Sequence, residues 1–151
     1  MPPLITLRTL NAGSLEPLPS LITLPSLITL PSLVIEGEAL VSKEPLGFYG
    51  CVNPKTGVVI EKGHELEGKS VKGKILVFPC GKGSTVGSYV IYGLAANKVA
   101  PKAIINKETE TIVATGVILG GIPCVDRIDI SEIKTGDKLK VNAEAGTVEK
   151  A

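Results

Sequence analysis

The sequence is poor in the residues that bind nucleic acids. It has no tryptophan, only two arginines (Arg8 and Arg127), an aromatic content of 3%, and a formal net charge of +1 over 151 residues. Nucleic-acid affinity comes mainly from basic residues that neutralise phosphates, and single strands are held by aromatic stacking platforms. We therefore expect no nucleic-acid partner.

Long hydrophobic runs and paired cysteines are also absent. No uninterrupted apolar run approaches the roughly 20 residues of a membrane span, and the apolar N-terminus is broken by prolines and has no cleavage site. Cys51, Cys80 and Cys124 form no CxxC pair. An odd number of cysteines without a signal peptide is typical of reduced thiols, so we expect a cytoplasmic protein without a membrane anchor.

The first 33 residues contain a short repeat. Residues 18–33 read LPSLITLPSLITLPSL, with the unit PSLITL at 19–24 and 25–30. A proline every sixth residue excludes a long helix, and two and a half copies are too few for a solenoid. We interpret residues 1–33 as a proline-punctuated, low-complexity extension without a catalytic role. An arm that packs against a partner subunit and a translation start near Val34 remain alternatives.

Residues 34–151 have the pattern of one mixed α/β domain. Apolar runs bounded by glycine and proline predict strands, and apolar spacings of three and four predict two helices, over about 85–97 and 110–119. The order of elements predicts a three-layer β/β/α or α/β domain. The predicted strands span 34–41, 57–60, 75–78, 103–106, 122–125, 138–141 and 146–149.

A glycine-rich turn, 79-PCGKGSTVG-87, joins a predicted strand to the first predicted helix. Glycines allow close approach of a ligand to the backbone, and a helix N-terminus favours negative charge. Lys82 is followed by Gly83, so the turn is not a Walker A motif, and GxSxG is absent from it. His64, the only histidine, lies in a charged segment and is interpreted as a solvated turn residue, which argues against a Ser–His–Asp triad.

Two interpretations of Ser84 and Thr85 follow from the turn. Both are typical N-capping residues that satisfy free N–H groups at a helix start. Alternatively, one hydroxyl faces a cleft and acts as a base, which requires a site that lowers the cost of its negative charge.

Four separated stretches resemble one known family. The stretches 36-EGEALVSKEPLGFYG-50, 53-NPKTG-57, 62-KGHELEGKSVKGKILVFPCGKGSTVGSYV-90 and 112-IVATGVILGGIPCVDR-127 together resemble the small subunit of archaeal aconitase X, the phosphomevalonate dehydratase of a modified mevalonate pathway. The resemblance covers about residues 34–145 and leaves the repeat uncovered.

The resemblance implies a fold, a partner and a reaction. It implies the swivelling β/β/α domain of the aconitase superfamily, and a larger subunit that holds an iron–sulfur cluster of the [4Fe–4S] type. The implied reaction removes water from (R)-5-phosphomevalonate to give trans-anhydromevalonate 5-phosphate. The family's proton-accepting serine falls on Ser84, and Lys82, Gly83 and Thr85 are the expected substrate-binding residues.

The remaining polar residues are given structural roles. Cys51, Cys80 and Cys124 are expected to be structural or incidental thiols, because cluster ligands are cysteines at paired spacing. Asp126 and Arg127 are expected to form an ion pair within the domain. Two functions remain alternatives: dehydration of another hydroxy acid such as cis-3-hydroxy-L-proline, and a non-catalytic module that binds anions or supports assembly.

Overall fold

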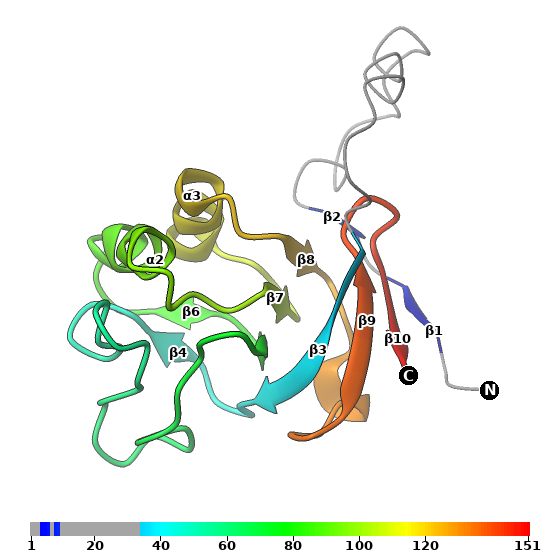
Figure 1. Cartoon of the computed structure of the whole chain (residues 1–151), viewed down its shortest axis with the longest axis horizontal. Helices are drawn as coiled ribbons and strands as arrows, with labels where there is room; N and C mark the ends of the chain where they lie inside the picture. Colours follow the sequence, from blue (N-terminus) through cyan, green and yellow to red (C-terminus); the bar gives the residue numbers. More distant parts are fainter. Residues whose placement is uncertain (1–3, 7, 10–33) are drawn as a thin grey trace, which may run out of the picture.

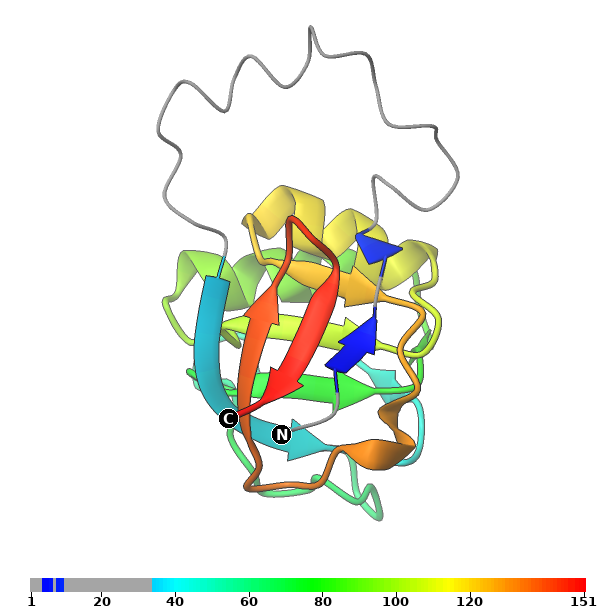
Figure 2. The ribbon, with the colours of Figure 1, turned by 90° about the vertical axis from the view of Figure 1, so that its right-hand side faces the viewer.

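The computed structural model describes residues 4–6, 8–9 and 34–151, which form a three-layer α/β domain (Figure 1). Two helices cover one side of a parallel sheet, and an antiparallel sheet lies on its other side (Figures 1 and 2). The strands are β1 (Leu4–Thr6), β2 (Arg8–Thr9), β3 (Val34–Val41), β4 (Leu46–Gly47), β5 (Ile75–Phe78), β6 (Gly81–Lys82), β7 (Ala103–Asn106), β8 (Cys124–Asp126), β9 (Lys138–Asn142) and β10 (Thr147–Lys150). The helices are α2 (Gly87–Ala96), α3 (Thr111–Gly120) and the 3₁₀ helix η2 (Ile130–Glu132).

The long strand β3 connects the two sheets. Its first half pairs antiparallel with β9, from Val34 opposite Asn142, and its second half pairs parallel with β5, from Ala39 opposite Ile75. The strand order β1-β10-β9-β3-β5-β7-β8-β2 is therefore one curved sheet that folds back over itself. At the bend, a Cβ on Gly37 would lie 3.1 Å from Ile75 Cγ1, so glycine allows the close approach.

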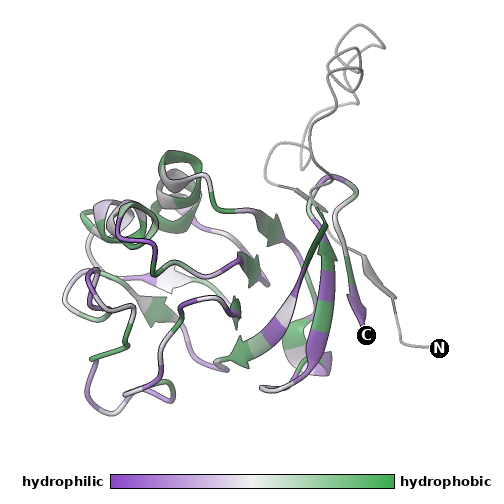
Figure 3. Ribbon diagram, in the orientation of Figure 1, coloured by the Kyte–Doolittle hydropathy of each residue, from purple (hydrophilic) through white to green (hydrophobic). Residues whose placement is uncertain are grey.

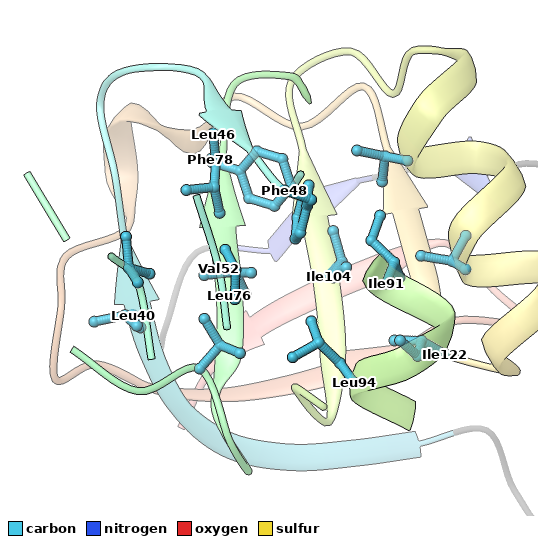
Figure 4. Packing of buried hydrophobic residues seen from close by; sticks show 14 of the residues in the cluster. Leu40, Leu46, Phe48, Val52, Leu76, Phe78, Ile91, Leu94, Ile104 and Ile122 are labelled. Carbon is cyan, nitrogen blue, oxygen red and sulfur yellow. The ribbon is translucent and has the colours of Figure 1, made fainter. Parts of the chain in front are cut away.

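The alternation of side chains along the parallel strands creates two hydrophobic cores. Leu76 and Phe78 of β5 point toward the helices, whereas Ile75 and Val77 point toward the antiparallel sheet. Because side chains alternate across a strand, a strand covered on both faces reads as a continuous apolar run. Figure 4 shows the helix-side core, in which the rings of Phe48 and Phe78 lie 5.9 Å apart.

The helices α2 and α3 pack closely against each other on the sheet. A Cβ on Gly116 of α3 would lie 2.7 Å from Ile91 of α2, so this helix contact requires glycine. Three side chains of these helices are fully buried: Ile91 and Leu94 of α2, and Val113 of α3. No helix in the described part of the chain is long and apolar enough to cross a membrane.

The predicted β/β/α layers are confirmed, and strands predicted at 34–41 and 75–78 have the predicted bounds. The strand predicted at 57–60 is wrong, because Val58 and Val59 form only isolated bridges. Both helices start later than predicted, at Gly87 and Thr111. Within the range 1–33, β1 pairs with β10 and β2 with β8. The PSLITL repeat lies outside the described residues, and the domain boundary at residue 33 stays a prediction.

Candidate active site at the turn before α2

The glycine-rich turn leaves the parallel sheet at the end of β5 and enters α2. After Pro79 and Cys80, the short strand β6 pairs in parallel with β4, and the Leu46 N–H donates to the Cys80 carbonyl at 3.1 Å. The chain then turns at Gly83 and reaches α2 at Gly87. Residues 82–86 are all exposed, so this turn is accessible from solvent.

Gly83 gives the turn its shape. Its φ is +89°, in the region that favours glycine, and a Cβ there would meet nothing within 4 Å. Backbone conformation, rather than lack of space, therefore selects glycine at this position. The residue that follows, Ser84, takes its direction from this turn.

Ser84 has an exposed hydroxyl inside a hydrogen-bonded turn. Its Oγ accepts a hydrogen bond from the Val86 N–H at 3.2 Å, and its carbonyl accepts one from the Gly87 N–H at 2.9 Å. The residue in the N-cap position of α2 is Val86, which makes no side-chain cap bond. Ser84 thus lies two residues before the N-cap position, and its hydroxyl binds the N–H of the N-cap residue instead of one inside α2.

The two helix N-termini near the turn differ in charge. The carboxylate of Glu110 caps α3, accepting from the Ile112 N–H at 2.8 Å and the Val113 N–H at 2.9 Å. A Cβ on Gly81 would overlap Glu110 and lie 2.8 Å from Val113 Cγ2, so glycine in β6 makes room for this cap. The start of α3 is therefore capped by a carboxylate, whereas the start of α2 has no side-chain cap and keeps its partial positive charge.

Lys82 is tied to a residue from a distant loop. Its Nζ lies 2.9 Å from Glu61 Oε2, although 45% of the lysine side chain is exposed. The hydrogen bond with Glu61 raises the pKa of Lys82. The same bond with Lys82 lowers the pKa of Glu61 from 4.5. At neutral pH both groups are charged, and the ammonium stays beside the serine turn.

Thr85 lines a hollow between the two helices. The hollow has a volume of about 280 Å³ and includes Tyr89, Thr111 and Leu119. At its base the buried Ser88 Oγ donates to the Ile112 carbonyl at 2.8 Å, which joins α2 to α3. A larger hollow of about 580 Å³, lined by Lys43, Lys107 and Asp129 among others, contains none of the four predicted site residues.

His64 is buried, so the prediction of a solvated turn histidine is wrong. Its Nδ1 accepts from the Leu66 N–H at 3.0 Å, and its Nε2 lies 3.0 Å from the Pro45 carbonyl. A backbone N–H can only donate and a carbonyl can only accept, so in these two contacts Nδ1 is the acceptor and Nε2 the donor. Both ring nitrogens contact the backbone, and Nε2 also lies 3.5 Å from Glu44 Oε1, so His64 holds its loop in place.

The three cysteines do not form a metal site. Burial raises the pKa of Cys124 to about 12, which keeps it a thiol. Burial, and then the neighbouring Glu61 carboxylate, raise the pKa of Cys51. Among the described residues no group of three histidine, cysteine or acidic side chains could hold a metal ion. Iron–sulfur ligands are thiolates, so the described part of this chain does not fit a cluster.

The predicted ion pair between Asp126 and Arg127 is present but long. Arg127 Nε lies 3.8 Å from Asp126 Oδ2, and Asp126 Oδ1 accepts hydrogen bonds from the Thr109 N–H at 2.7 Å and the Arg127 N–H at 2.8 Å. Asp126 therefore serves mainly to fix the loop after β8. The sequence reasoning missed Glu61 and Glu110, which lie far along the chain from the turn that they support.

Comparison with known proteins places these residues in context. Residues 29–150 match the model of the family described as the aconitase X swivel domain. The phosphomevalonate dehydratase small subunit of Thermococcus gammatolerans is 59% identical over 114 residues, 76% of this chain and 87% of that protein. The protein of the same name from Methanocaldococcus jannaschii is 60% identical over 114 residues, again 76% of this chain and 87% of the relative.

Solved structures give the same result. The crystal structure of Thermococcus kodakaraensis aconitase X in its holo-form matches with a TM-score of 0.81 and 45% sequence identity. The match covers 99% of this chain and 98% of that one. The curved sheet with two covering helices is therefore the fold of a solved aconitase X chain.

Proposed function

The chain belongs to the aconitase X swivel-domain family, and from this premise we propose that it is the small subunit of a phosphomevalonate dehydratase. Two observations support the proposal: relatives that bear this name are 59% and 60% identical over 76% of the chain, and a serine turn with an exposed hydroxyl lies at the start of α2. The substrate would be (R)-5-phosphomevalonate and the product trans-anhydromevalonate 5-phosphate.

The reaction removes a weakly acidic proton and a hydroxyl group from adjacent carbons. The proton leaves the carbon next to the substrate carboxylate, the C–H electron pair forms the new double bond, and the C–O bond of the neighbouring hydroxyl breaks to give water. A base must accept the proton when the C–H bond breaks. We assign this role to Ser84 in its alkoxide form, which becomes the neutral hydroxyl on accepting the proton.

The surroundings of Ser84 support a role as proton acceptor. A serine hydroxyl is a poor base unless the site stabilises the oxygen when it is negatively charged. The Val86 N–H already donates to Ser84 Oγ at 3.2 Å, and the uncapped start of α2 adds partial positive charge nearby. These groups are fixed by the turn, so they need no rearrangement when the proton is transferred.

Lys82, Gly83 and Thr85 would hold the substrate around this serine. The Lys82 ammonium is partly exposed and offers a charge for the substrate's carboxylate or phosphate. Gly83 leaves the backbone uncovered, because it has no side chain and a Cβ there would meet nothing within 4 Å. Thr85 borders the hollow between α2 and α3 and adds a second hydroxyl.

The departing hydroxyl needs help that the described residues of this chain do not supply. They offer no group of metal ligands, so the iron–sulfur cluster implied by the family would belong to the large subunit. There, an iron with an open coordination position would act as a Lewis acid toward the hydroxyl. The name "small subunit" borne by the relatives is consistent with such a division of labour.

The proposal is tested by co-expressing the chain with the large-subunit gene of the same genome and assaying the purified complex. We expect the complex to remove water from phosphomevalonate. Mass spectrometry of the product would detect this loss. Turnover of cis-3-hydroxy-L-proline in place of phosphomevalonate would show a different substrate. A stable complex, with its cluster intact, that turns over neither compound would support the non-catalytic assembly module.

A further inference from the structure

All three tyrosines of the sequence lie exposed on the helical side of the domain. Tyr89 and Tyr92 of α2 are 68% and 48% exposed, and Tyr49, in the loop after β4, is 60% exposed. Tyrosine is enriched at protein interfaces, where its large ring gives contact area and its hydroxyl tolerates water. The chain has few aromatic residues, and all of its tyrosines lie on this helical side.

The exposed aliphatic side chains lie on the same side. Among the described residues, the remaining large hydrophobic side chains with high exposure are Ile60, Val86, Ile118 and Leu119. They come from the loop between β4 and β5, from the turn at the start of α2 and from the end of α3. Figure 3 shows hydrophobic residues along both helices, whereas β9 alternates between hydrophilic and hydrophobic residues.

This surface contains two grooves. One, of about 280 Å³, lies between α2 and α3 beside Tyr89 and Leu119. The other, of about 420 Å³, lies between α2 and the loop that carries Tyr49 and Ile60. Grooves rimmed by exposed aromatic and aliphatic residues are suited to receive the anchoring side chains of a protein partner.

The surface is continuous with the serine turn. Val86 follows Thr85 directly, and Thr85 itself lines the groove that contains Tyr89 and Leu119. If Ser84 accepts a proton from a substrate whose hydroxyl is held by the large subunit, that subunit must cover the turn at the start of α2. Whatever covers the turn also meets Val86 and Tyr89.

We propose that the helical face formed by the exposed residues of α2, α3 and the 49–60 loop is the docking surface for the large subunit. This inference rests on the proposed function, because that function identifies the occupant. Docking here would bury the apolar side chains and close the serine turn between the two proteins. A second copy of this chain on the same face would instead block Ser84.

The test measures the affinity of the full chain for the purified large subunit by isothermal titration calorimetry. Tyr89→Glu adds a negative charge near the start of α2, and Ile118→Lys adds a positive charge near the end of α3, so each charge suits its helix dipole. Both side chains are exposed, so the fold should tolerate the changes. Thermal unfolding of each variant checks that it does.

Matched controls come from the β9–β10 hairpin, on the other side of the sheet (Figure 1). Ala145 is exposed there, so Ala145→Glu and Ala145→Lys make the same charges at a remote position. We expect Tyr89→Glu and Ile118→Lys each to raise the Kd at least about tenfold, as central interface residues do, and the Ala145 variants to stay within about threefold.

The proposed docking surface is refuted if the two helix variants bind the large subunit like wild type, or if the Ala145 variants weaken binding equally. It is also refuted if the wild-type chain does not bind the large subunit. It is also wrong if Tyr89→Glu only disrupts self-association of this chain. A dehydratase assay on the same samples separates the two proposals. If the Tyr89 and Ile118 variants weaken binding but the wild-type complex does not dehydrate phosphomevalonate, the proposed function is refuted and the proposed docking surface is supported.

Discussion

Lys82 Nζ lies 2.9 Å from Glu61 Oε2, so the lysine beside the proposed catalytic serine is held by a carboxylate from a separate loop. The partners are 21 residues apart in the chain. The loop that carries Glu61 is in turn fixed by the buried His64 and its bonds to Leu66 and Pro45. This relationship makes Lys82 a positioned cation near the proposed site.

Removing the Lys82 charge should weaken substrate binding. We expect Lys82→Ala to raise the KM for phosphomevalonate about tenfold or more, the usual effect of losing a hydrogen bond to a charged group, with a smaller change in kcat. Glu61→Gln is the informative contrast. Glu61 raises the pKa of Lys82 above 10.5, so without this carboxylate the lysine is still protonated at neutral pH.

The Gln side-chain oxygen can still accept the Lys82 hydrogen bond, so the lysine keeps both its charge and its position. KM should therefore stay within about threefold in Glu61→Gln, as steady-state kinetics of the complex would show. The exposed Lys72 gives a matched control, since Lys72→Ala should change neither parameter.

The stability of the Glu61→Gln variant gives a second readout. The pKa of Glu61 is lowered below 4.5, so its carboxylate stabilises the fold above that pH, and the advantage over Gln declines as the pH falls through the lowered pKa. A Lys82→Ala complex with an unchanged KM would contradict the substrate-binding role.

Gly83 and Gly136 form a natural pair for testing the turn. Both have a positive φ, +89° and +96°, and a Cβ at either position would meet nothing within 4 Å. Alanine should cost about 1–2 kcal/mol of unfolding free energy at each, because an L-residue is strained in this region. Urea unfolding measures this cost.

Only Gly83→Ala should also lower turnover, because only Gly83 sets the direction of Ser84. Gly136 lies in the turn before β9, away from the glycine-rich segment. We expect kcat of the Gly83→Ala complex to fall at least about tenfold and that of Gly136→Ala to stay near wild type. Equal losses of activity in both variants would indicate that general destabilisation, rather than the shape of the serine turn, limits the enzyme.

The layers of the fold could be predicted from the sequence, because buried strands such as Ile75–Phe78 read as continuous apolar runs. The turn was also visible, since glycine and serine lie next to each other along the chain. The partners of the turn were not. Glu61 and Glu110 are brought next to Lys82 and Gly81 only by the fold. The charged residues around His64 also gave no sign that its ring would be buried and hydrogen-bonded to the backbone.

Cys124 should be chemically protected in the folded chain. Burial raises its pKa from 9.0 to about 12, so at pH 8 almost none of it is the reactive thiolate. We expect iodoacetamide to modify Cys124 only after unfolding in urea, as peptide mass spectrometry would show, while the half-buried Cys80 serves as the internal reference.

The pH dependence follows from the same shift. Between pH 9 and about 12 the unfolded chain loses the Cys124 proton while the folded chain keeps it, so this group lowers stability as the pH rises through that range. Cys124→Ala should remove that part of the alkaline destabilisation. Rapid labelling of Cys124 in the native chain at pH 8 would show that β8 opens readily.

The most direct measurement is the turnover of the Ser84→Ala complex on phosphomevalonate. The hydroxyl is exposed and accepts one hydrogen bond, from the Val86 N–H, so its loss should cost about 1 kcal/mol of stability or less and leave the complex intact. The exposed Ser131, which also hydrogen-bonds within its own turn, gives the control Ser131→Ala. The account predicts that Ser84→Ala lowers kcat at least about 10²-fold, the lower end for loss of a general base, while Ser131→Ala stays near wild type. A Ser84→Ala complex with an intact cluster that turns over phosphomevalonate within a few-fold of wild type would contradict the account.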